Sequence, residues 1–269
     1  MTRKAAILVA SVFLIGGMAF AKDGTKLFLG YSLGRVSGES TWYYTFSPGS
    51  SGSEVQKFSA TPHGPSFDAR YEKDRLFVRG LFDYYFLASA KANWEGGPSV
   101  GTEGNFWIAE ADFGYRVMSR ESTTLTPYVG LGYLRQRTTE VSSDVIKYSS
   151  PAAALGAIVG RSAPQWSIGF DGALLILFSG KTVEYYGDYS DTYKHGVGWG
   201  VRFQVPFTYN ITKKENSTGI MAFATPSYIY INTGKSNTLT WEAGTVMESW
   251  SVKTGLNLLG IKVGVGFAF

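Results

Sequence analysis

The stretch that decides the fold is HGVGWGVRFQVPFTYN, residues 195–210. Large apolar side chains stand at every second position from Val197 to Tyr209, and glycine, proline or polar residues stand between them. This period of two puts the apolar side chains on one face of an extended strand. The alternation runs for 15 residues, whereas strands of soluble proteins usually have about 5–6 residues. A tilted strand that crosses a bilayer needs about 9–11 residues, so the stretch predicts a membrane-spanning β-strand.

The last residues, LLGIKVGVGFAF (258–269), show the same pattern. From Ile261 to Phe269 every second side chain is large and apolar, and the residues between them are lysine, glycine or alanine. A strand of this kind presents its apolar face to lipid and its small face to an interior. We therefore expect the chain to end on the closing strand of a β-barrel.

The first 21 residues have the form of a secretory signal peptide. Arg3 and Lys4 precede an apolar run that ends on Ala19-Phe20-Ala21, a small-x-small cleavage pattern. The alternative is a permanent anchor, but the run is short and contains Gly16-Gly17. We expect cleavage after Ala21, which leaves residues 22–269 as one domain.

Composition agrees with a membrane barrel and excludes other classes. Aromatic residues make up 16%, glycine occurs 33 times, and cysteine is absent, so disulfides cannot hold the chain together. Residues 1–21 carry two of the 25 Lys and Arg and no acid, so the remaining domain has a formal charge of only +2, which gives no reason to expect nucleic acid as a partner. No run of about 18 apolar residues follows the signal, so no membrane-spanning helix is expected.

Alternation recurs along the chain in segments separated by connections of two kinds. The short connections lie near 72–75, 119–123, 162–165 and 212–217, and the long polar connections near 45–65, 93–104, 139–146, 181–194 and 234–246. Four short and five long connections join ten strands, although eight or twelve remain open. The pattern leaves open which face points outward in the segments 124–138, 147–160 and 218–233. The predicted fold is an all-β, antiparallel transmembrane barrel with short periplasmic turns and long extracellular loops.

These features together resemble the bacterial outer-membrane β-barrel proteins. The resemblance covers the mature chain and depends on the signal peptide, the alternating strands, the loop asymmetry and Phe269. It implies location in the outer membrane, contact with outer-membrane lipid and lipopolysaccharide, and recognition of Phe269 by the barrel-insertion machinery. Aromatic girdles are expected at the strand ends. The residues expected there are Trp42, Tyr43, Tyr44, Tyr128, Tyr133, Tyr185, Tyr186, Trp199 and Trp250.

Charged residues fall on the inward positions of the predicted strands. The acids are Asp68, Glu72, Asp83, Glu110, Asp112 and Asp171, and the bases are Arg70, Arg79, Arg116, Arg202 and Lys262. Because buried charges are tolerated only when paired, six acids and five bases predict a mutual ion-pair network that fills the lumen. A conducting pore is the alternative, favoured by the inward glycines Gly198, Gly200, Gly264 and Gly266, which leave space.

Catalytic signals are weak. His195 stands near Asp188 and Asp191, and a carboxylate beside a histidine at the barrel rim could activate water. Omptin surface proteases have a similar strand count and use aspartates with an Asp-x-His pair, but the spacing Asp191 to His195 does not match that pair, and the facing loop has no Asp-x-Asp. No spacing of metal ligands appears, so no metal or cofactor is expected.

The long connections are rich in Tyr, Ser, Gly, Thr and Asn, a composition that suits surface recognition. The sequence therefore favours a surface protein with a structural, adhesive or ligand-binding role toward an extracellular ligand or a host surface. A small diffusion pore is the second hypothesis. A rim hydrolase of omptin type is the third.

Overall fold

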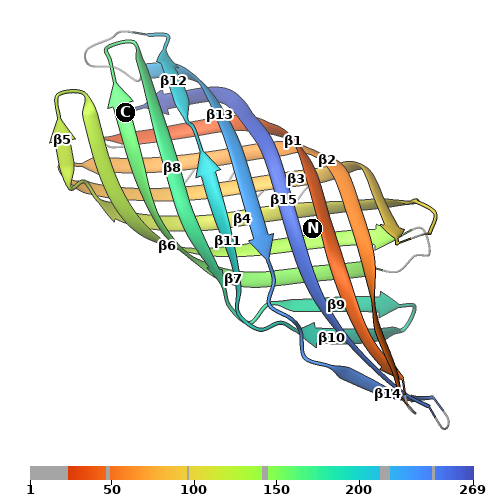
Figure 1. Ribbon diagram of the computed structural model, residues 1–269. Coiled ribbons are helices and arrows are strands. Elements are labelled where there is room, and N and C mark those ends of the chain that lie inside the picture. The colour runs from red at the N-terminus through yellow and green to blue at the C-terminus, as the bar shows by residue number, and fades with distance from the viewer. Residues whose placement is uncertain (1–23, 47–48, 96, 141–144, 213–218, 244–245) are drawn as a thin grey trace.

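The computed structural model describes residues 24–269 apart from 47–48, 96, 141–144, 213–218 and 244–245 (Figure 1). The predicted signal peptide, residues 1–21, lies outside the described residues. Within the described part, all regular structure is β-strand. That part contains no helix of the length and apolarity needed to cross a membrane.

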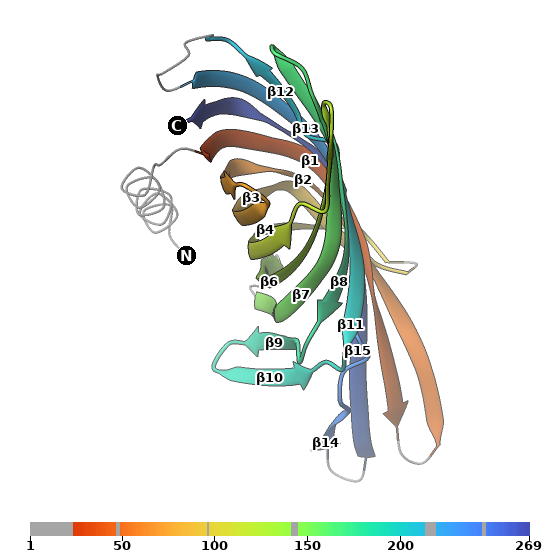
Figure 2. The same ribbon diagram turned by 90° about the vertical axis from the view of Figure 1, so that its left-hand side faces the viewer.

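The strands form one closed antiparallel barrel (Figures 1 and 2). Ten walls follow one another around it, and the ring closes because β7 pairs with β8 as well as with β6. The walls are β1 (Thr25–Phe46), β2 (Ser50–Lys73), β3 (Leu76–Trp94), β4 (Val100–Tyr115), β6 (Thr123–Glu140), β7 (Val145–Ser162), β8 (Trp166–Leu177), β11 (Gly198–Gln204) continued by β12 (Phe207–Asn210), β13 (Gly219–Asn232) and β15 (Val246–Ala268). The ten-stranded prediction is confirmed.

The 195–210 stretch forms the wall of β11 and β12. Pro206 lacks an N–H and interrupts the strand, yet the register continues across it: Gln204 pairs with Asp171, and Phe207 pairs with Ile168. Trp199 and Phe203 are exposed on the outer side. The long alternation therefore marks one wall made of two strands in a single register.

The last strand closes the barrel against the first. β15 pairs with β1 over their whole common length, from Lys26 opposite Ala268 to Phe46 opposite Glu248. The Phe269 N–H donates to the Thr25 carbonyl at 2.9 Å, and the Gly24 N–H donates to the Phe269 carbonyl at 3.1 Å. The terminal residue is thus held in the seam.

The two ends of the barrel differ as expected, but the long connections are mostly strand. The end that carries the short turns, here the turn end, has the small strand β5 (Met118–Arg120) and the C-terminus (Figure 1). At the opposite end, the hairpin end, β1, β2 and β15 extend beyond the other walls, and β9 (Lys181–Tyr186), β10 (Tyr189–Lys194) and β14 (Leu239–Ala243) form further hairpins. The prediction of a loop at 45–65 is therefore wrong, because β2 pairs with β1 from Ser50 onward.

The outer surface carries an apolar belt. The side chains exposed there include Phe113, Leu131, Leu155, Phe170, Leu174, Phe203, Leu259, Ile261, Val263 and Val265. The strands that the sequence left undetermined now have a facing: Leu131 on β6, Val159 on β7 and Ile220 on β13 point outward. A protein in water would not expose such a continuous apolar surface, so the belt is suited to lipid.

Candidate functional site: a charged lumen below a polar mouth

All eleven charged residues expected in the lumen have an ion-pair partner in the structure. We call them the lumenal charge cluster; the pairs are Asp68–Arg70, Glu72–Arg116, Asp83–Lys262, Arg79 with Asp112 and Asp171, and Arg202 with Glu110 and Asp171. They come from β2, β3, β4, β8, β11 and β15, and Arg116 follows the end of β4. Three of the seven pairs, Arg79–Asp171, Glu110–Arg202 and Asp83–Lys262, join side chains at least 92 positions apart, which the closed barrel brings together.

Arg79 stands at the centre of this cluster. Its Nε donates to Asp112 Oδ2 at 2.8 Å, and its Nη1 donates to Asp171 Oδ2 at 2.6 Å. The side chains of all three residues are at most 1% exposed. One guanidinium thus bridges a carboxylate on β4 and a carboxylate on β8. The planar guanidinium is suited to this role because its five N–H donors form a rigid fork.

Tyr128 completes the centre and was missed by sequence reasoning. Its hydroxyl donates to Asp171 Oδ1 at 2.6 Å and accepts from Arg202 Nη2 at 2.9 Å. The sequence predicted Tyr128 in an aromatic girdle; that expectation is wrong, because the residue faces the lumen and is 4% exposed. Its ring occupies the space beside Gly156, where a Cβ would lie 2.4 Å from the ring.

Two of the inward glycines on β15 lie against neighbouring groups. A Cβ on Gly266 would meet the Phe28 ring at 2.7 Å, and a Cβ on Gly264 would meet the Leu29 carbonyl at 2.1 Å. Each glycine permits the close approach of a neighbouring ring or strand. At Gly266 a side chain therefore occupies the space that the glycine leaves, whereas the carbonyl beside Gly264 belongs to the adjacent strand of the wall.

An apolar layer lies on the hairpin side of the charge cluster. Along β6, Tyr128 is followed by buried Leu134, and along β8, Asp171 is followed by buried Leu175 and Leu177. Side chains from opposite walls meet in this layer. Its other large members include Phe106, Ile229, Ile231, Leu256 and Leu258. The sequence reasoning expected polar or small inward residues, so this layer is a correction: here the strands are apolar on both faces.

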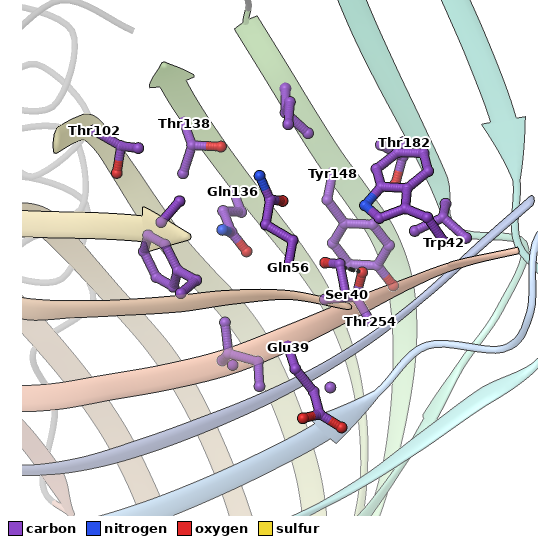
Figure 3. Close-up of a pocket in the computed structure, with 17 residues that line it drawn as sticks. Glu39, Ser40, Trp42, Gln56, Thr102, Gln136, Thr138, Tyr148, Thr182 and Thr254 are labelled. Carbon is purple, nitrogen blue, oxygen red and sulfur yellow. Dashed lines mark hydrogen bonds between the residues drawn. The ribbon is translucent and has the colours of Figure 1, made fainter. Parts of the chain in front are cut away.

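Beyond the apolar layer the interior becomes polar again and forms a cavity of about 70 Å³, which we call the mouth cavity (Figure 3). Its hydrogen-bonding lining comes from seven strands: Ser40, Trp42, Gln56, Thr102, Gln136, Thr138, Tyr148, Thr182 and Thr254. A smaller cavity of about 20 Å³ lies at the level of Asp68 and Lys262. The two cavities share no lining residue, because the apolar layer separates them.

Two buried polar atoms in the mouth cavity have no hydrogen-bond partner: Trp42 Nε1 and Thr102 Oγ1. Trp42 is 6% exposed and Thr102 is 8% exposed. The Tyr148 hydroxyl also lines the cavity and can donate or accept a hydrogen bond. The sequence predicted Trp42 in a girdle; instead it forms the wall of this cavity and packs edge-on against Tyr193, with ring centroids 5.5 Å apart.

His195 lies above the apolar belt and is held on both sides. Its Nδ1 is 2.8 Å from the Gly234 carbonyl, to which it can only donate, and its Nε2 is 2.8 Å from the Thr182 hydroxyl. Burial lowers the pKa of His195, although the bond to Gly234 opposes this, so the neutral ring is favoured. The structure records no contact from His195 to Asp188 or Asp191, so these three residues do not form an acid–base pair in the described part of the chain.

A closed antiparallel barrel with an apolar outer belt and a paired interior defines the class of bacterial outer-membrane β-barrels. No protein-family model matches the sequence, and no curated protein sequence matches it either. Among the described residues, no group of His, Asp or Glu is arranged to hold a metal ion.

Solved structures show the same fold. The outer membrane protease OmpT of Escherichia coli is similar with a TM-score of 0.60 and 9% identity, over 91% of this chain and 97% of that one. OprG of Pseudomonas aeruginosa matches more loosely, with a TM-score of 0.41 and 13% identity over 93% of this chain and 97% of that one. The translocator domain of the Neisseria meningitidis autotransporter NalP has a TM-score of 0.40 and 10% identity over 99% of this chain and 96% of that one. At this identity the likeness to OmpT extends to the fold alone.

Proposed function

We propose that this protein resides in the bacterial outer membrane, that its lumen is closed to ions, and that it binds a ligand at the cell surface through its hairpin end. The observation that carries the proposal is the order of layers inside the barrel. A buried charge cluster and an apolar layer stand one above the other, and the polar mouth cavity opens only beyond them.

Each inner layer opposes ion passage for its own reason. In the charge cluster, acid and base side chains occupy the lumen and neutralise each other, so no single-sign lining remains to attract an ion. In the apolar layer, packed leucine and isoleucine side chains leave no polar group to replace the hydration shell of an ion. The diffusion-pore hypothesis is therefore the weaker one.

Single-channel recording tests the closed lumen. Full-length protein refolded from detergent into planar bilayers is expected to give no steady conductance steps, with insertion verified by protease protection of the barrel. Regular, salt-dependent steps from the inserted wild-type protein would overturn the proposal and restore the pore.

The expected partner around the barrel is lipopolysaccharide, and a basic cluster on the outer face supports this. Arg137 stands directly opposite Lys147, and Arg135 and Lys181 flank the same neighbour, Ser149. Like charges directly opposite each other are destabilising, so this cluster favours an anion between them. It begins just above Tyr133, at the height where phosphate groups of the outer leaflet would lie.

The barrel-insertion machinery is the other proposed partner. Phe269 supports it by its place at the end of β15, in the seam with β1. Replacing Phe269 by Ala is expected to lower the amount of protein that reaches the outer membrane, while the purified variant still refolds in detergent. Unchanged membrane levels would exclude Phe269 as the recognition element.

A further inference from the structure

We propose that the mouth cavity binds a neutral saccharide, such as the uncharged end of a glycan. This inference deepens the proposed function and rests on it, because it assigns a ligand class to the hairpin end. Its basis is the chemistry of the lining, which combines aromatic rings, hydroxyls and amides with an uncharged interior.

The cavity selects against charge. Its one charged lining residue in the described structure is Glu39, which is exposed and points away from the others (Figure 3). The remaining hydrogen-bonding groups are neutral at physiological pH. A charged ligand would lose its hydration there without gaining a counter-charge, and that loss is expensive.

The cavity also contains polar atoms that only a ligand or solvent can satisfy. Trp42 Nε1 is a donor, and Thr102 Oγ1 can donate or accept, and both are more than nine-tenths buried without a partner in the protein. Leaving such groups unpaired is costly, so binding is favoured for a ligand that offers both acceptors and donors. A sugar hydroxyl offers both at once.

The arrangement favours a sugar ring over a peptide. Gln56, Gln136 and Thr138 approach from one side, and Trp42 and Tyr148 present aromatic surface at the other (Figure 3). Hydroxyls that radiate from a compact ring meet such a lining in every direction, and the apolar face of the ring can lie on the aromatic side. Peptides often bind by pairing with a free sheet edge. The ring of ten walls has no free edge, and β10 and β14, which each have a single neighbour, contribute no residue to the cavity lining.

The size of the cavity limits what enters it. The enclosed volume of 70 Å³ has room for about five to seven water molecules. The empty space around it, counted together with the part that is open to solvent, is about 700 Å³. One sugar ring can insert while the rest of a glycan remains outside. The β1–β2 hairpin and the β9–β10 hairpin border this opening.

The test uses the refolded full-length protein on an array of neutral oligosaccharides and their sialylated or phosphorylated counterparts, followed by calorimetry with the neutral glycan that binds best. Thr102→Val and Thr138→Val remove hydroxyls from the cavity and are expected to weaken binding at least tenfold each. Thr139→Val, the matched control on the outer face next to Thr138, is expected to leave affinity unchanged.

Three results would overturn the inference: no neutral glycan bound, a preference for the anionic counterparts, or full affinity in both cavity variants. Trp42→Phe keeps an aromatic ring and removes the Nε1–H donor, so this variant should also weaken glycan binding. The bilayer recording separates the two proposals. If the protein does not conduct and binds no glycan, only the saccharide proposal is refuted. If the protein conducts, the proposal of a closed lumen is refuted, whatever the protein binds.

Discussion

Replacing Arg79 by Met should destabilise the barrel strongly, because it removes the guanidinium that bridges the buried carboxylates of Asp112 and Asp171. Asp112 loses its ion-pair partner, whereas Asp171 keeps the Tyr128 hydroxyl at 2.6 Å and a more distant Arg202 at 3.9 Å. Methionine fills most of the volume without restoring the charge. The damage is therefore electrostatic and centred on Asp112.

The magnitude follows from the contacts. A charge pair at 2.7 Å has a gross attraction of about 6 kcal/mol at an effective dielectric constant of about 20, but much of it repays the desolvation of the charges. Breaking a buried pair by removing one partner costs about 3–5 kcal/mol, which is the expected loss for Arg79→Met. The double variant Arg79→Met/Asp112→Leu removes the stranded carboxylate too, and we expect it to recover most of that loss.

The assay is reversible urea unfolding in phospholipid vesicles, followed by tryptophan fluorescence and by the mobility shift of folded barrels on unheated gels. Arg120→Met, an exposed arginine at the turn end, is the control and should change stability by less than about 0.5 kcal/mol. A loss below about 1 kcal/mol for Arg79→Met would refute the reasoning, because it is the value expected of a solvated surface pair. It would mean that water reaches the centre of the lumen.

Three further predictions test other parts of the structure. Phe203→Arg, in the apolar belt midway along its wall, should cost about 2–4 kcal/mol in vesicles, whereas Val197→Arg beyond the belt should cost about 0–1 kcal/mol; equal costs would mean that the belt is misplaced. Because the pKa of His195 is lowered on folding, the unfolded chain binds an extra proton below pH 6.5, so stability should fall as pH drops through that value and His195→Gln should lose that part of the slope; identical pH profiles would contradict the buried neutral ring. Arg137→Ala should weaken lipopolysaccharide binding about fivefold at low salt, and Lys253→Ala, outside the basic cluster, should not; a loss from both would indicate a diffuse charge effect.

Period-two alternation was sufficient to predict the barrel, its ten walls and the outward face of most strands. The alternation is strict where one face meets lipid and the other carries glycine or charge, as in β11. It was ambiguous on β6, β7 and β13, where large apolar or aromatic side chains occupy both faces. Examples are buried Tyr128 and exposed Tyr133 on β6, and buried Met221 and exposed Ile220 on β13. In those strands only pairing with defined neighbours fixes the facing, because a shift of one residue would exchange the two sides.

The candidate site was harder to predict because it depends on closure of the ring. Arg79 and Asp171 are 92 positions apart, and no local pattern links them. Trp42 and Tyr128 carry the same sequence signal as girdle residues, an aromatic near a strand end, and their inward direction follows from register alone. The mouth cavity draws its hydrogen-bonding lining from seven strands, so its polar character appears in no single segment.

The apolar layer also explains how so many charges can be buried together. On the hairpin side, Leu134, Leu175 and Leu258 close the lumen above the central pairs, so water from the mouth cavity has no polar path toward Arg79. Without water, each charge must find its partner within the protein, and the walls supply acids and bases in nearly equal number. The same layer separates the polar mouth from the cluster, which leaves the hairpin end free to vary its lining without disturbing the charge balance that the barrel requires.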